Sequence, residues 1–362
     1  MTAEPAPLAI VGAAVFDGGG GPPSPDRTVV VRGGRIERVG PPAAVRPPPG
    51  AVVVGAAGCT LLPGVVDAHV HLGFYPPAEV LRGGVTTVRD LGWPAGRLAA
   101  LRGLAEAPGA ASPRLLAAGQ IVTVPGGYPT RAAWAPTGTA VPVRDGGEAA
   151  AAVAMLAAAG AAVIKVALDG RVGPTLPGPL LAAVVAAARQ HGLAVTAHVA
   201  GNGEVEKALA AGVGELAHWP LQRRVLDERL IARLAASVTV VPTLHIEPSR
   251  ARRRGVRRFI AMGGRVVYGT DLGNRGPPPA VDVEELRLLV EAGLAPGQAL
   301  AAATSVAAAH LGLADAGRVV PGARADLLLV EGDPLADLAA LTRVRLVTRD
   351  GWIAGGAEAA GG

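Results

Sequence analysis

Cysteine is almost absent from this sequence, since Cys59 is the only one in 362 residues. A single cysteine excludes an intrachain disulfide and favours a reducing, cytoplasmic setting. Charged residues make up only 17% of the chain and hydrophobic residues 50%, which excludes extended disorder and provides for a large core. The nearest approach to a membrane span, 149–164, is mostly alanine, contains Gly160 and ends at Lys165. We interpret it as a helix, a turn and a strand.

Aromatic residues are also scarce, at 3%, although the chain carries a net charge of +5. The densest basic run, RARRRGVRR at 250–258, contains six arginines. A single-stranded nucleic-acid site would add aromatic side chains that stack on bases, and only Phe259 lies near this run. We therefore predict a solvated helix face, a small-molecule partner, and neither a nucleic-acid nor a membrane partner. A homo-oligomer stays open.

Neither end of the chain has a segment long enough to form a domain of its own. Short Val- and Ile-rich runs separated by Gly and Pro fill the first sixty residues and return near the C-terminus, as in GRVVPGARADLLLVEG. Neither terminal piece is long enough to bury a core alone. We therefore expect residues 1–60 and 315–362 to form one composite β-domain, with a larger domain at 61–314 inserted between them.

Within that larger domain, apolar segments of strand length alternate with Ala- and Leu-rich segments of helical length. The predicted strands are 65–71, 85–90, 114–122, 162–168, 193–198, 214–218, 238–244 and 265–271. The segments predicted as helices include 147–159, 178–190, 203–211 and 226–236. Eight such strands predict an α/β fold, a (β/α)8 TIM barrel accompanied by a small β-sandwich from both termini.

Polar residues fall at the carboxyl ends of these strands, where such a barrel keeps its chemistry. His69 and His71 are two residues apart, so both side chains point to the same side of their strand. The other strand ends carry Lys165, His198, His218 and Asp271. One such histidine alone is more often a satisfied polar side chain than a ligand. Six residues at five strand ends predict a metal site.

Lys165 is one of only two lysines, against thirty-two arginines, and lies in an almost wholly apolar run. A buried ammonium is costly and has no lone pair to offer a cation. Desolvation beside metal ions would lower the pKa of Lys165 and leave a neutral amine. That amine can react with carbon dioxide to form a carbamate, whose two oxygens can each hold a metal. The alternative is a Schiff-base lysine, but the surrounding histidines favour the carbamate.

The segments PGVVDAHVHLG, VIKVAL, VTAHVAG, ELAHWP and VYGTDLG together resemble the metal-dependent amidohydrolase superfamily. They look most like its binuclear branch, which includes Xaa-Pro dipeptidase-like and imidazolonepropionase-like members. The similarity covers nearly the whole chain, because GLAPGQALAAATSVAAAHLGL and GRVVPGARADLLLVEGDPL look like the family's closing helices and its return to the small β-domain.

This resemblance implies two divalent metal ions, with zinc as the default and manganese or cobalt as alternatives. The implied ligands are His69, His71 and Asp271 for the deeper metal, His198 and His218 for the second, and N-carboxylated Lys165 as the bridge. A hydroxide shared by both metals would be the nucleophile. Asp271 would take its proton and pass it to the leaving nitrogen.

Substrate contacts are expected from loops at the same end of the barrel. Tyr128 and Arg131 lie in VPGGYPTRAAW after the third strand, where family members often carry a histidine instead. His245 follows the seventh strand, and Trp219 is expected to form a wall of the pocket.

The sequence therefore predicts a hydrolase of C–N bonds that acts on a dipeptide, an N-acyl amino acid or a cyclic amide. A lactonase, esterase or phosphotriesterase would use the same metal site and is the nearest alternative. A non-catalytic scaffold on this fold is the alternative from another class. Such a scaffold usually lacks ligands, and here none is missing.

Overall fold

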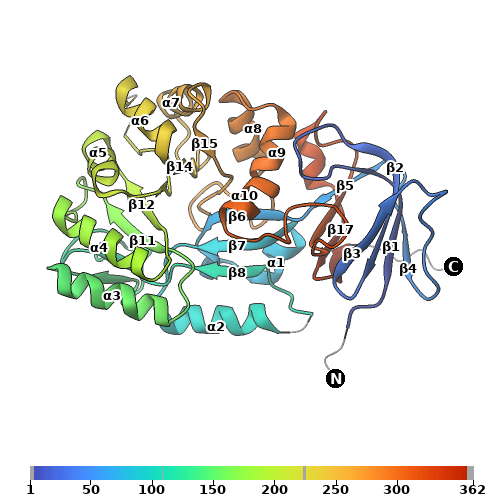
Figure 1. The fold of residues 1–362 in the computed structure, drawn as a ribbon, viewed down its shortest axis with the longest axis horizontal. Helices are drawn as coiled ribbons and strands as arrows, with labels where there is room; N and C mark the ends of the chain where they lie inside the picture. Colours follow the sequence, from blue (N-terminus) through green and yellow to red (C-terminus); the bar gives the residue numbers. More distant parts are fainter. Residues whose placement is uncertain (1–3, 108, 223–225, 357–362) are drawn as a thin grey trace.

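Strands from both ends of the chain share one β-sheet, at the right of Figure 1. The computed structural model describes residues 4–107, 109–222 and 226–356. The strands of this sheet are β1 (Leu8–Val15), β2 (Ser24–Arg32), β3 (Arg35–Gly40), β4 (Val52–Gly55), β5 (Cys59–Pro63), β16 (Leu327–Glu331), β17 (Val344–Arg349) and β18 (Trp352–Gly356). The order is β18-β17-β16-β5-β1-β2-β3, with β4 paired to β1. The C-terminal strands therefore join the N-terminal ones through β5.

Turn chemistry and apolar side chains explain this terminal sheet. Gly33 and Gly34 connect β2 to β3 with φ angles of 53° and 74°, the left-handed conformation that a two-residue hairpin turn requires and glycine adopts without strain. On one side of the sheet, Val29 packs in the same buried cluster as Leu327, which comes from the other end of the sequence. Long-range apolar packing thus holds the two terminal segments together.

The remaining strands are parallel and form two further sheets. The smaller sheet contains β6 (Val65–Val70), β7 (Val85–Asp90) and β8 (Arg114–Ala117). The larger sheet has, in order, β10 (Ala140–Pro142), β9 (Ile121–Thr123), β11 (Ile164–Leu168), β12 (Val195–Val199), β13 (Glu215–Leu216), β14 (Thr239–Val240) and β15 (Arg265–Val266). The predicted strand 114–122 is split into β8 and β9, because Gly119 between them has a φ of 77°.

Backbone hydrogen bonds connect the two parallel sheets along both edges of the smaller one. Beyond β6, the amide of Asp271 donates to the carbonyl of His69 at 2.7 Å. Beyond β8, the amide of Ala162, shortly before β11, donates to the carbonyl of Ala117 at 2.8 Å. These bonds join β6 to the segment after β15, and the end of β8 to the segment before β11.

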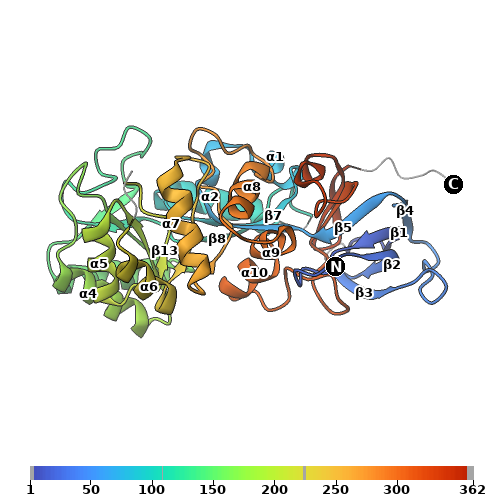
Figure 2. The ribbon, with the colours of Figure 1, turned by 90° about the horizontal axis from the view of Figure 1, so that it is seen from above.

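Helices lie around the outside of the parallel strands, and the molecule is elongated with the terminal sheet at one end (Figures 1 and 2). They are α1 (Pro77–Arg82), α2 (Ala95–Glu106), α3 (Gly146–Ala158), α4 (Gly178–Gln190), α5 (Asn202–Ala211), α6 (Glu228–Ser237), α7 (Arg250–Ala261), α8 (Val283–Glu291), α9 (Pro296–Ala302) and α10 (Ser305–His310). Short 3₁₀ helices span Leu72–Phe74 and Leu338–Thr342.

The segment 149–164 forms most of α3 and the approach to β11, as predicted. None of the helices in the described part of the chain combines the length and the apolar character that a membrane crossing needs.

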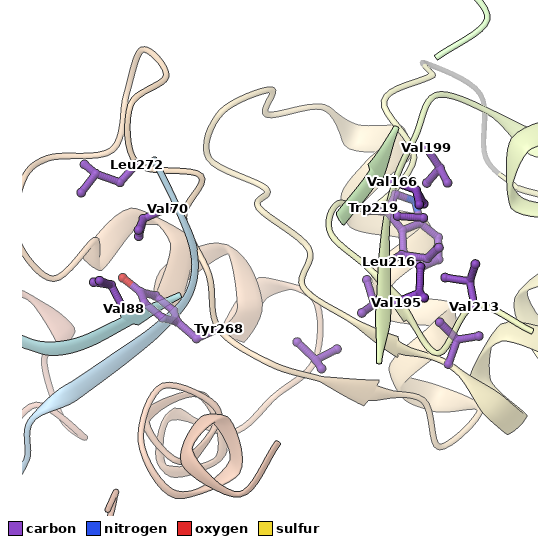
Figure 3. Packing of buried hydrophobic residues seen from close by; sticks show 14 of the residues in the cluster. Val70, Val88, Val166, Val195, Val199, Val213, Leu216, Trp219, Tyr268 and Leu272 are labelled. Atoms are coloured by element: carbon purple, nitrogen blue, oxygen red, sulfur yellow. The ribbon is translucent and has the colours of Figure 1, made fainter. Parts of the chain in front are cut away.

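Two details of the sequence interpretation are wrong. Trp219 is not a pocket wall: Figure 3 shows it beside Val166 and Leu216 in the apolar core, and it is only 1% exposed. The arginine run is not solvated throughout, because Arg252 on α7 is buried and donates to the carbonyls of Pro242 and Thr243. The division of the chain at residues 60 and 315 stays a prediction, and residues 1–3 and 357–362 of that β-domain lie outside the described ranges.

Candidate metal centre

The polar residues predicted from the strand ends meet at one cavity. Five come from the carboxyl end of a parallel strand or from the loop after it: His69 and His71 with β6, His198 with β12, His218 after β13 and Asp271 after β15. Lys165 is the second residue of β11. All six line the same cavity of about 380 Å³, and all six are buried. The structure thus brings together every residue that the resemblance marks as a ligand.

Asp271 lies among the histidines. Its Oδ1 is 3.2 Å from Nε2 of His69 and 3.3 Å from Nε2 of His71, and its Oδ2 is 3.6 Å from Nδ1 of His218. Burial alone would raise the pKa of Asp271, but these three imidazoles hold it well below its usual range. The carboxylate is therefore ionised and available to a cation.

The facing atoms of His69 and Asp271 fit a cation between them. Nδ1 of His69 lies 2.8 Å from the carbonyl oxygen of Ala217, which can only accept, so Nδ1 carries the proton. Burial lowers the pKa of His69 well below its usual value, and in the neutral ring Nε2 then keeps a lone pair. Nε2 of His69 and Oδ1 of Asp271 are both buried without a hydrogen-bond partner among the described residues. Two such acceptors repel one another unless a cation lies between them.

His218 completes a candidate group of three ligands. Each of His69, His218 and Asp271 offers one possible metal-ligand atom that lies within 4.8 Å of those of the other two. Nδ1 of His218 is 3.0 Å from Oγ1 of Thr243, which leaves Nε2 for a metal if Nδ1 is the donor. Imidazole nitrogens with a carboxylate oxygen are the donor set that zinc and related divalent cations prefer.

Two of the four non-glycine residues with a positive φ in the described part of the chain belong to this site. Asp271 has a φ of 56° and Thr243 a φ of 44°, in the left-handed region that non-glycine residues rarely adopt and β-branched residues least of all. Strain of this kind persists only where the surroundings enforce it, and it gathers at functional sites.

Lys165 is buried within the same cavity, with 3% of its surface exposed. Burial lowers its pKa to about 7, against an opposing contribution from Asp271. A substantial fraction of the side chain is therefore a neutral amine near neutral pH, which is the form that the carbamate hypothesis requires.

The Amidohydrolase family model matches residues 60–355, which span all six of these residues. The chain belongs to the amidohydrolase family of enzymes. This amidohydrolase is 37% identical to the imidazolonepropionase of Deinococcus deserti over 179 residues, 48% of this chain and 43% of that protein. The enamidase of Eubacterium barkeri is 36% identical over 77 residues, 18% of this chain and 20% of that protein. The matches thus span less than half the length of these curated relatives.

Solved structures match over nearly the full length. A proposed prolidase from Bifidobacterium longum superposes with a TM-score of 0.84 and 29% identity, covering 98% of this chain and 97% of that one. A Xaa-Pro dipeptidase crystallised with methionine in its active site has a TM-score of 0.84 and 23% identity, over 96% and 99% of the two chains. The amidohydrolase therefore has an α/β, TIM-barrel-like fold.

Two of the three predicted substrate residues lie outside the cavity lining. Tyr128 lines it and stacks on the ring of His198, with 4.8 Å between the ring centroids. Arg131 is exposed, and its guanidinium lies near Gly126. His245 is turned toward Asp282, whose Oδ2 is 2.7 Å from its Nδ1. Arg131 and His245 therefore do not reach the lining of this cavity, and a substrate contact by either residue stays a prediction.

Other lining residues were missed by the sequence interpretation. Trp134 donates its Nε1–H to the hydroxyl of Tyr128 at 2.9 Å and approaches the ring of His71, with 4.9 Å between centroids. Asp169 and Arg171, at the end of β11, also line the cavity. Asp169 follows a strand directly and could have been found by the rule that found the other six. Trp134 lies in a loop, where no comparable signal exists.

Proposed function

We propose that this amidohydrolase is a metal-dependent hydrolase of C–N bonds with a dipeptide, an N-acyl amino acid or a cyclic amide as substrate. The observation that carries the proposal is the pair of buried acceptors, Nε2 of His69 and Oδ1 of Asp271, 3.2 Å apart without a donor between them. The names of the relatives, an imidazolonepropionase, an enamidase and a prolidase, support the same reaction class.

The proposed centre holds two divalent cations, with zinc as the first choice. His69, His71 and Asp271 would hold one cation, and His198 and His218 the other. The lowered pKa of Lys165 and its position in the same cavity support its carboxylation and its role as the bridging ligand. When bound, the cations would supply an activated water and polarise the carbonyl of the scissile bond.

The chain's own residues supply proton transfer and orientation. Asp271 is ionised and buried at the centre of the cavity, so it can accept a proton from the attacking water and pass it to the leaving nitrogen. Tyr128 already accepts a hydrogen bond from Trp134, so its own hydroxyl proton is free for a substrate oxygen. Burial raises the pKa of Tyr128, which keeps that proton in place at neutral pH.

The finer features of the fold belong to the same proposal. We propose that the parallel strands close into an eight-stranded barrel, supported by the hydrogen bonds between Asp271 and His69 and between Ala162 and Ala117. The terminal strands would form the β-sandwich domain, with boundaries near residues 60 and 315. A cytoplasmic location is supported by Cys59, a buried free thiol.

The test is a substrate panel on protein purified in bicarbonate buffer and assayed with added zinc, manganese or cobalt. The panel contains dipeptides including Xaa-Pro, N-acyl amino acids, cyclic amides, lactones and phosphotriesters. We expect C–N hydrolysis that a chelator abolishes and added metal restores. Turnover of lactones or phosphotriesters alone, or metal binding without turnover of any C–N substrate, would contradict the proposed reaction.

A further inference from the structure

The histidines of the candidate centre differ in which ring nitrogen is already engaged. His69 and His71 direct Nδ1 toward backbone carbonyl oxygens, at 2.8 and 3.4 Å, and His218 directs Nδ1 toward Oγ1 of Thr243 at 3.0 Å. In His198 the other nitrogen is engaged, because Nε2 lies 3.2 Å from Oδ2 of Asp169.

Asp169 is held in place by donors on both carboxylate oxygens. Oδ1 accepts from the backbone amide of Arg171 at 3.1 Å and from its Nε at 2.9 Å. Oδ2 accepts from Nη2 of Arg171 at 2.7 Å and faces Nε2 of His198. Asp169 is only 3% exposed, so its orientation is fixed by these contacts.

This arrangement differs from the pairing of His69 with Asp271. There, both facing atoms are buried without a hydrogen-bond partner, as expected for two ligands of one cation. Asp169 instead already accepts hydrogen bonds from the guanidinium and the backbone amide of Arg171. It can accept one more, from Nε2–H of His198, and its pairing with a guanidinium makes it poorly suited to bind a cation.

We infer that Asp169, clamped by Arg171, is a positioning residue that sets the tautomer of His198. With the proton on Nε2, Nδ1 keeps the lone pair and becomes the nitrogen that binds the second metal. A group that hydrogen-bonds a metal-binding histidine in this way fixes the orientation of the ring, and its loss typically costs about 10–100-fold in metal affinity. The inference rests on the proposed function in one respect, that His198 is a metal ligand.

The same contacts limit the role of Arg171. Its Nε and Nη2 are both committed to Asp169, although the side chain lines the cavity and is 48% exposed. Its main role in this structure is to hold Asp169, so a change at Arg171 acts on the metal through Asp169 and His198.

The test compares Asp169→Ala and Asp169→Asn with wild type by two measurements. The first is the nitrogen-15 chemical shifts of the His198 ring in metal-free protein, assigned by comparison with His198→Asn, which report the tautomer directly. The second is titration with zinc and with cobalt in competition with a chromophoric chelator, which reports both affinities. The matched control is Asp17→Ala, which removes an exposed carboxylate that accepts from Arg318 in the terminal sheet region.

We expect wild type to show the Nε2–H tautomer, and Asp169→Ala to show a mixture and to bind one of two cations about 10–100-fold more weakly. Asp169→Asn retains an acceptor oxygen and is expected to restore the tautomer and most of the affinity. If Asp169→Ala does not fold, the same two measurements are made on Asp169→Asn. An unchanged tautomer and unchanged affinities in Asp169→Ala would overturn the inference. Failure of wild type itself to bind two cations would instead overturn the proposed function.

Discussion

Two clusters of buried polar side chains lie among the parallel strands, and they differ in whether their members pair with each other. In the first, Nη2 of Arg89 donates to Oε1 of Glu215 at 2.6 Å and Nε donates to the carbonyl of Ala68 at 2.9 Å, while the other oxygen of Glu215 pairs with His310. In the second, the candidate metal centre, His69 and Asp271 face each other as two acceptors.

The difference shows how a structural group of buried charges is told from a functional one. In the first cluster a cation meets an anion, so nothing further is needed. In the second, Oδ1 of the ionised Asp271 carboxylate faces Nε2 of His69, and neither atom has a hydrogen-bond donor among the described residues, so this pair needs an external cation. The left-handed backbone of Asp271 and Thr243 marks only the second cluster. Burial alone does not separate the two.

The largest expected effect is that of Lys165→Ala, which removes the proposed bridge from the second cluster. Metal content, measured by mass spectrometry, is expected to be close to two ions per chain in wild type, and the variant should lose most of it. Turnover should fall by more than about 10⁴-fold, beyond the usual contribution of one proton-transfer group, because both cations lose a shared ligand. Short carboxylic acids are expected to restore part of the activity by standing in for the carbamate.

The chain offers a matched control, because Lys207 is the only other lysine. Lys207 lies on α5, and its Nζ donates to Thr175 Oγ1 at 2.6 Å. Lys207→Ala should keep full metal content and turnover. If Lys165→Ala also keeps both, the carbamate hypothesis is wrong.

A smaller effect is expected for Asp271→Asn, which keeps the size of the side chain and one oxygen but removes the base. The variant should retain substantial metal and lose at least about a hundredfold in turnover of amides. Activated esters should lose less, because their leaving group does not need a proton. Turnover of both substrate types on this variant is the measurement, and equal losses would mean that Asp271 is only a ligand.

The expectation that parallel strands carry their carboxyl ends to one edge led to six candidate ligands that line one cavity, although Lys165 is the second residue of β11 and not at its carboxyl end. It found them without knowing strand lengths, although β13, β14 and β15 have only two residues each. Loop side chains lie outside its reach. The direction of His245 depends on Asp282, thirty-seven residues later, and that of Trp134 on its contact with Tyr128. Such contacts are set by tertiary packing, which no local pattern encodes.

The smallest effect on metal binding is expected for Glu215→Gln, which alters the first cluster, in which Glu215 pairs with Arg89 and His310. The change leaves the guanidinium of Arg89 buried without its counter-charge, so the free energy of unfolding at pH 7 should fall by about 3–5 kcal/mol. Metal content of the folded variant should match that of wild type, since the cluster needs no cation. Loss of metal together with stability would mean that the two clusters are not separate.

The pH dependence of that stability difference tests its electrostatic origin. Burial alone would raise the pKa of Glu215, but Arg89 and His310 hold it well below the ordinary value of 4.5. A lowered pKa in the folded state stabilises the protein above the unfolded value, and this stabilisation is lost as the pH falls below it. The deficit of Glu215→Gln near neutral pH should therefore be on the order of the loss expected for a broken buried pair, and it should shrink below about pH 4.5. Denaturant unfolding of both proteins across this range reports the charge of Glu215 together with its pairing to Arg89 and His310. A deficit that stays constant down to the lowest pH would assign the loss to packing instead of charge.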